Sequence, residues 1–258
     1  MLSNKLEDDM TDLNTPRPYW RTLATLLWSL VIFSVFGLAQ LFGAMLIMTK
    51  EAGRQLTEAD IMAMLPGLET NGNILTWATL VSFIVAVPAM LLIIKFKKFS
   101  NLRDYLALNH ARLGDYVKWT LIMLVAVVLL SLVGESLGET SADKFTGNVF
   151  KSADSKFLLY VAVAFCAPVF EELFFRGFMY KGLAHGPMGP IGAIVATSLV
   201  WAVIHVQYDW FPIVMIFVMG IILGLARWKT NSIYVPIVMH AINNFVSLAL
   251  VGAGISGV

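Results

Sequence analysis

The chain contains few charged residues and almost no cysteine. Of its 258 residues, 14% are Asp, Glu, Lys or Arg, against about 25% in an average soluble domain. The one cysteine, Cys166, excludes an intramolecular disulfide. Because 18 basic residues are nearly balanced by 17 acidic ones, the charge predicts no surface that binds nucleic acid. A disulfide-stapled domain and a nucleic-acid-binding protein are both disfavoured.

Apolar residues make up 58% of the chain, and the mean hydropathy is +0.76. A soluble domain of this size could not bury so much apolar surface in one core. The apolar residues form long runs and do not alternate with polar ones, which disfavours an outer-membrane barrel. The fold class predicted is therefore all-α, a polytopic transmembrane helical bundle.

Seven apolar stretches are about long enough to cross a bilayer core of about 30 Å as helices, so we expect seven or eight spans. The predicted spans are 22–48, 74–94, 118–137, 157–180, 189–206, 211–227 and 232–252. They divide the chain into an N-terminal tail (1–21), a three-span region (22–156) with a basic loop (95–118), and a four-span core (157–252). The tail shows no signal-peptide pattern.

Lys and Arg predict the orientation of the chain, because they are enriched in cytoplasmic loops. Twelve of them would lie on the side of the N-terminus and of loop 95–118, and five on the opposite side, while Arg176 lies within a span. We therefore expect a multi-pass integral membrane protein with its N-terminus inside and its C-terminus outside. In the first loop, between spans 22–48 and 74–94, Thr57 and Asp60 have the spacing of a helix N-cap.

Charged residues inside the spans are the strongest functional signal, since each costs about 2.5–3.5 kcal/mol at the membrane centre. The fourth span carries Glu171, Glu172 and Arg176. Glu172 and Arg176 lie at i and i+4, in the order that favours an ion pair. Glu171 points about 100° away around the helix and cannot share Arg176 equally. Without a cation of its own, its charged form is disfavoured by burial, which suits it to act as a general base. The alternative is that the charges only lock two helices together.

Two histidines and an asparagine add polar groups to the neighbouring spans. His205 lies at the end of the fifth span, while His240 and Asn244 lie at i and i+4 on one face of the seventh. Side chains of this kind can donate hydrogen bonds to a developing oxyanion, although a membrane histidine can also serve only as an interhelical partner. No His is followed by Glu, so the H-E-x-x-H zinc-protease motif is absent.

These residues resemble the motifs of the CPBP family, which comprises CAAX prenyl proteases and bacteriocin-processing (Abi-type) intramembrane proteases. The family's E-E-x-x-x-R motif matches Glu171, Glu172 and Arg176, and its H-x-x-x-N motif matches His240 and Asn244. Its F-x-x-x-H motif matches at His205, with Trp201 in the place of Phe, and F-x-x-G resembles 217–220. The resemblance covers about residues 157–250.

The resemblance implies an endopeptidase that hydrolyses a peptide bond close to the membrane surface, in the cytoplasmic membrane of a bacterium. Glu171 would activate a water with the help of His205, while His240 and Asn244 would stabilise the oxyanion. Glu172 and Arg176 would hold the site in shape. The partners implied are the lipid bilayer and a peptide or prenylated-protein substrate.

Several alternatives stay open from the sequence. No cofactor is favoured, but Glu171, His205 and His240 could instead supply three ligands to Zn²⁺. The chain could also be a non-catalytic immunity or scaffold protein, or an ion-coupled transporter. For the three residues to converge, the fifth helix must be displaced or begin near Gly192, because His205 otherwise lies too close to the membrane surface.

Overall fold

The computed structural model describes residues 18–64, 67–68, 70–138 and 141–255, so most of the predicted tail 1–21 lies outside the described residues. Every regular element within those ranges is a helix, which confirms the all-α fold class. The long apolar helices are α2 (Thr22–Ala52), α4 (Gly72–Phe96), α6 (Leu113–Ser136), the continuous run Lys156–Ala184, α12 (Trp210–Thr230) and α13 (Tyr234–Gly252). Each overlaps one predicted span.

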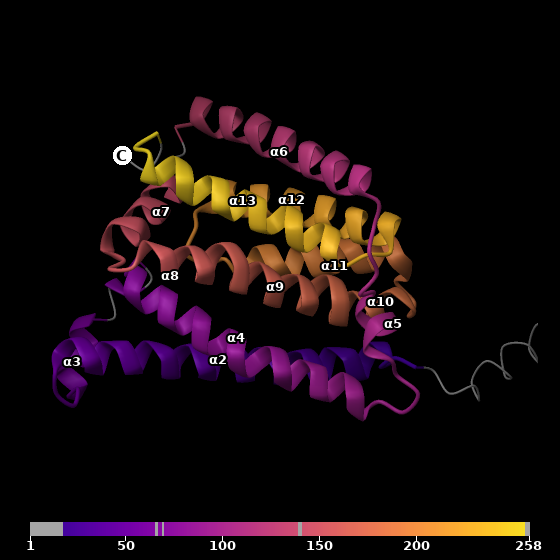
Figure 1. Ribbon diagram of the computed structural model, residues 1–258, viewed down its shortest axis with the longest axis horizontal. Helices are drawn as coiled ribbons and strands as arrows, with labels where there is room; N and C mark the ends of the chain where they lie inside the picture. Colours follow the sequence, from indigo (N-terminus) through magenta and orange to yellow (C-terminus); the bar gives the residue numbers. More distant parts are fainter. Residues whose placement is uncertain (1–17, 65–66, 69, 139–140, 256–258) are drawn as a thin grey trace, which may run out of the picture.

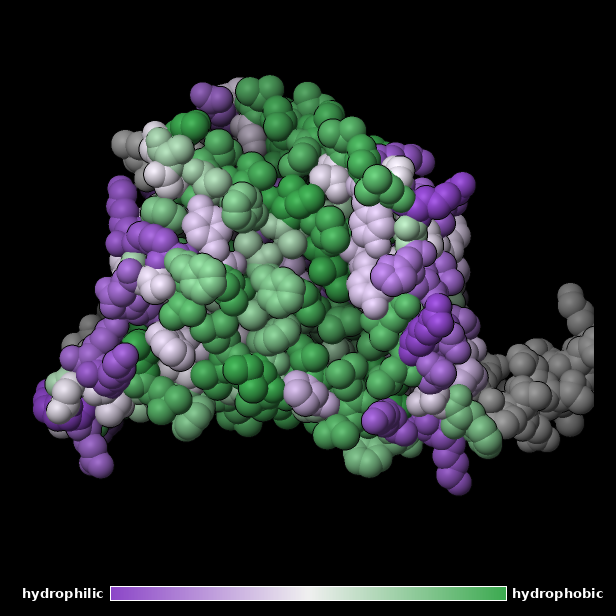
Figure 2. Space-filling view, viewed as in Figure 1, coloured by the Kyte–Doolittle hydropathy of each residue, from purple (hydrophilic) through white to green (hydrophobic). Residues whose placement is uncertain are grey.

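The outer surface is that of a membrane protein. Figure 2 shows a broad hydrophobic band between two hydrophilic rims at opposite ends of the bundle. Large apolar side chains are exposed within this band, including Leu30 (66%) on α2 and Leu129 (58%) on α6. Six described helices are long and apolar enough to cross a bilayer. The chain is therefore a multi-pass membrane protein.

The helices are arranged around the run Lys156–Ala184 (Figure 1). Helices α2 and α4 pack as an antiparallel pair on one side of it, and α11 (Gly189–Val203), α12 and α13 lie on the other. Helix α6 packs against α12 and α13 at the edge. The α2–α4 approach needs Gly43, because a Cβ there would lie 2.8 Å from the carbonyl oxygen of Trp77.

The bundle has two distinct ends. Figure 1 shows α3 (Glu58–Met64), α7 (Ser141–Ser152) and the chain's C-terminus at one end, which we call the α7 end. The short helix α5 (Leu102–Leu106) and the last turn of the central run lie at the opposite end, the α5 end. The α7 end also carries the predicted N-cap: Thr57 donates its hydroxyl and its backbone N–H to Asp60.

The central run is not a uniform α-helix. It consists of α8 (Lys156–Tyr160), η2 (Val161–Cys166), α9 (Ala167–Glu172), η3 (Leu173–Met179) and α10 (Tyr180–Ala184), in which η2 and η3 are π-helical. Wider π turns change the direction of side chains relative to a regular helix and are frequent at functional sites. They flank the segment that carries the paired glutamates.

Helix α11 is shorter than the predicted span 189–206. It begins at Gly189, not near Gly192, and ends at Val203. Fifteen residues rise about 22 Å, which is less than the bilayer core of about 30 Å. His205 therefore lies in a loop below the membrane surface. The depth mismatch expected from a full-length fifth span does not arise, because the chain leaves the helix early.

Candidate active site

Glu172 and Arg176 form the buried ion pair that their spacing predicts. Arg176 Nη1 donates to Glu172 Oε1 over 3.0 Å, and neither side chain is exposed to solvent. The same carboxylate oxygen accepts a bond from His240 Nδ1 at 2.9 Å. The pair thus fixes the central run to α13, since a buried carboxylate is stable only with partners that satisfy it.

Arg176 also ties the central run to α11 and α12. Its Nη2 donates to the carbonyl oxygen of Gly220 at 3.2 Å, and its guanidinium lies 4.4 Å from the centroid of the Trp201 ring. A Cβ on Gly220 would lie 2.8 Å from Cβ of Ser198 and 3.1 Å from Arg176 Nη2. The glycine of the F-x-x-G motif therefore leaves space for the guanidinium.

Glu171 has a different environment from Glu172. Its side chain is half-buried, and its Oε2 accepts a hydrogen bond of 2.5 Å from Trp201 Nε1. Because Trp201 also packs against the Arg176 guanidinium, one indole joins the buried ion pair to the glutamate that faces the cavity. Sequence reasoning treated Trp201 as an aromatic wall and missed its N–H donor, although its position four residues before His205 was a signal.

His205 and His240 both approach the Trp201 ring, with centroid separations of 5.4 and 5.2 Å. His205 Nδ1 lies 2.7 Å from the carbonyl oxygen of Trp201, so Nδ1 carries the proton. His240 Nδ1 is likewise engaged by Glu172. Each histidine therefore has its Nε2 left for contact with a bound molecule.

Asn244 lies one turn beyond His240 on α13, and both line the same cavity, as their spacing predicts. Its Nδ2 donates to the carbonyl oxygen of Val163 in the π-helical segment η2 over 3.0 Å. Since an amide nitrogen carries two hydrogens, one remains for another acceptor. The sequence did not indicate the contact with Val163, because the π turn leaves no recognisable pattern.

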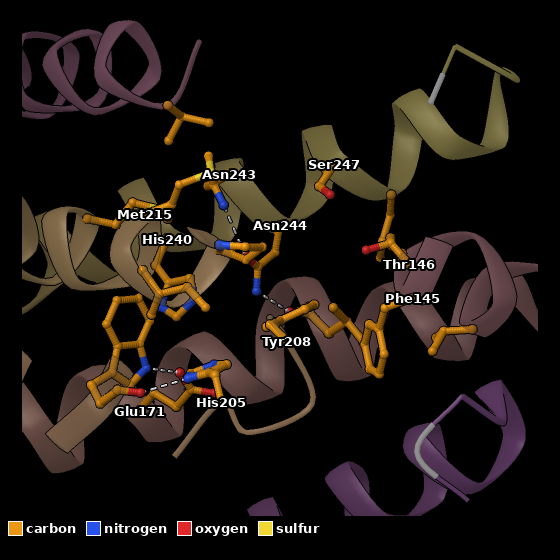
Figure 3. A pocket seen from close by; sticks show the side chains of 18 of the residues that line it. Phe145, Thr146, Glu171, His205, Tyr208, Met215, His240, Asn243, Asn244 and Ser247 are labelled. Carbon is orange, nitrogen blue, oxygen red and sulfur yellow. Dashed lines mark hydrogen bonds between the residues drawn. The ribbon is translucent and has the colours of Figure 1, made fainter. Parts of the chain in front are cut away.

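The cavity that receives these side chains has a volume of about 290 Å³. Figure 3 shows Glu171 and His205 side by side at one end of it, with Thr146 and Ser247 toward the other. Polar and apolar groups are mixed in its wall, which is a suitable environment for water and a peptide. Four of the six predicted site residues line it: Glu171, His205, His240 and Asn244. Glu172 and Arg176 lie behind them.

Within the described ranges, no group of three or more His, Cys, Asp or Glu side chains is arranged to hold a metal ion. Glu171, His205 and His240 share the cavity but do not form such a group. Cys166 is buried and free.

Fold and site together define a helical membrane protein with a polar cavity inside the bundle. Residues 153–246 match the model of the Rce1-like family, described as type II CAAX prenyl endopeptidase Rce1-like. The membrane-embedded CAAX protease MroQ of Staphylococcus aureus (strain USA300) is 27% identical over 201 residues, which cover 71% of this chain and 78% of that protein. An uncharacterized 24.3 kDa protein of Escherichia coli is 29% identical over 124 residues, or 46% of this chain and 56% of that protein. No solved structure matches the chain.

The family match covers the central run, α11, α12 and most of α13, which are the elements that supply the site. The chain is therefore a multi-pass membrane protein whose residues 153–246 resemble the Rce1-like family and which is similar to a CAAX protease.

Proposed function

We propose that the chain is an intramembrane endopeptidase in which Glu171 activates water for attack on a peptide bond. The observation that carries the proposal is the placement of a half-buried carboxylate in a polar cavity beside two histidines and an amide. Glutamate in such a site can act as a general base. The family match and the similarity to MroQ, a CAAX protease by name, support proteolysis.

In the proposed mechanism, Glu171 takes a proton from a water held between it and His205 Nε2. The hydroxide attacks the scissile carbonyl carbon, and the carbonyl oxygen becomes an oxyanion. The free amide hydrogen of Asn244 and the Nε2 side of His240 stabilise that charge, provided that His240 is protonated there. The C–N bond then breaks, and the proton from Glu171 passes to the leaving amine.

Glu172 and Arg176 act as positioning residues in this proposal. Glu172 holds His240 through Nδ1, and Arg176 holds Glu172 and the ring of Trp201. Preorganised groups of this kind stabilise developing charge without rearrangement during the reaction. We propose that no metal is required and that substrates are peptides or prenylated proteins. We also propose that the α5 end faces the cytoplasm of a bacterial cell, because of its excess of Lys and Arg.

The test is cleavage of internally quenched peptides, with and without a farnesylated C-terminal CAAX tetrapeptide, by the purified full chain in lipid nanodiscs. Glu171→Gln, which is nearly isosteric, should abolish cleavage while leaving membrane insertion intact. The matched control is Glu58→Gln on the exposed helix α3, which should retain activity. Unchanged function in Glu171→Gln would favour a non-catalytic scaffold, and ion flux without cleavage would favour a transporter.

A further inference from the structure

The cavity extends from Glu171 toward the α7 end. Part of its remaining wall is formed by residues close to the helix ends at that side. Leu75 lies three residues after the start of α4, Ser131 five before the end of α6, and Ser247 five before the end of α13. Thr146 of α7 and Tyr208 of the loop after α11 complete this part of the wall. Figure 3 shows Thr146 and Ser247 on the side away from Glu171, with Tyr208 between them and His205.

The opposite direction is closed by packed side chains. On the side of Glu171 toward the α5 end, the side chains of Glu172, Arg176 and Phe178 are completely buried, and Phe175 is 1% exposed. Further toward the α5 end, Leu223 of α12 has no exposed surface either. A molecule from the α5 end would have to break the buried ion pair to reach Glu171, which would leave uncompensated charges in a low-dielectric interior.

The distribution of charged residues indicates which end of the bundle faces the cytoplasm. Among the residues that the structure describes, five Lys and Arg belong to the α7 end and ten to the α5 end. In the same described ranges, the α7 end carries seven acidic residues, against two at the α5 end. Because Lys and Arg are retained on the cytoplasmic side, the α7 end faces away from the cytoplasm.

From these observations we propose that the site opens to the extracytoplasmic side, and that its substrates are polypeptide segments presented there. This inference rests on the proposed proteolytic function of the same cavity. Glu171 lies fifteen residues, or about 22 Å, from the α7 end of its helix. An extended chain spans that depth with about seven residues, so the substrate must enter as an unfolded strand.

The opening can be tested without any cleavage assay, because the chain contains a single cysteine. In a Cys166→Ala background, Ser247→Cys reports on the cavity wall, Lys144→Cys on exposed α7, and Lys98→Cys on the α5 end. Intact cells are treated with a membrane-impermeant maleimide, before or after permeabilisation. We expect the cysteines at 247 and 144 to react in intact cells and the cysteine at 98 only after permeabilisation. Labelling of 247 only after permeabilisation, or from neither side, would overturn the inference.

A second arm measures the side of cleavage. Impermeant, internally quenched decapeptides with randomised central residues, and farnesylated CAAX peptides, are supplied to right-side-out and to inverted membrane vesicles. Cleavage dependent on Glu171 is expected in right-side-out vesicles, at least tenfold above that in inverted ones. The reverse ratio contradicts the extracytoplasmic opening but supports the proposed function. External labelling at 247 without cleavage in either orientation supports the opening and contradicts the proposed function.

Discussion

Trp201→Phe separates two roles of one side chain. Phe keeps a ring that can stack on the Arg176 guanidinium, now 4.4 Å from the Trp201 centroid, but it removes the Nε1 donor to Glu171. It is also the residue usual at this position in the family, so we expect the protein to fold. In the proposed mechanism Trp201 acts as a positioning residue, because its N–H holds the carboxylate of Glu171.

The size of the effect follows from the hydrogen bond that is lost. A hydrogen bond to a charged group contributes about 1.5–3 kcal/mol, which corresponds to a factor of about 10 to 150 in rate. We expect kcat to decrease by a factor in that range and KM to change much less, since the N–H group holds the general base. The matched control is Trp210→Phe, at a side chain that is 61% exposed, and it should leave kcat unchanged.

Indole NMR supplies a readout that a merely structural role would not change. The seven tryptophans give seven indole N–H signals, of which Trp201→Phe removes one. Glu171→Gln should shift that same signal, because its acceptor changes from a carboxylate to an amide. A Trp201→Phe variant with kcat within about twofold of the wild-type value, or an indole signal insensitive to Glu171→Gln, would refute the reasoning.

Three further outcomes are expected. Gly220→Ala should lower the thermal midpoint by an amount equivalent to about 1–3 kcal/mol, because its Cβ would lie 2.8 Å from Cβ of Ser198. The control Gly37→Ala should leave the midpoint unchanged, because a Cβ there would have nothing within 4 Å. Equal midpoints for the two variants would contradict this packing. Arg54 and Thr57 hold Asp60 ionised and keep its pKa well below the usual range. The contacts of its carboxylate in the loop should therefore persist as the pH falls through about 4 and be lost only in stronger acid. An NMR titration of Asp60 near the ordinary value of about 3.9 would contradict the pairing. Activity should survive chelation and metal depletion, while loss of activity with recovery on added zinc would support the metalloprotease alternative.

Local spacing was sufficient to predict several features of this molecule. Long apolar runs predicted the spanning helices, because hydrocarbon admits few other backbone conformations. The i, i+4 spacing predicted the contact between Glu172 and Arg176 and the shared face of His240 and Asn244. These predictions hold because the relevant geometry is contained within one helix.

Contacts between distant helices could not be predicted in this way. The bond between His240 and Glu172 joins residues 68 positions apart, and the bond from Trp201 to Glu171 depends on how α11 packs on the central run. The early end of α11 was also missed, since Val203 to Val206 stays apolar in sequence across the helix boundary apart from His205. The direction of the cavity depends on side chains from several helices and a loop.

The central claim is that Glu171 is the base that activates water. Its most direct test is the ratio of kcat between the wild-type chain and Glu171→Gln, on a peptide that both proteins bind with equal affinity. General-base catalysis contributes about 10²–10⁴ in rate, so the ratio should be at least about 100. A ratio of less than about threefold, in a variant that is correctly inserted, would contradict the account.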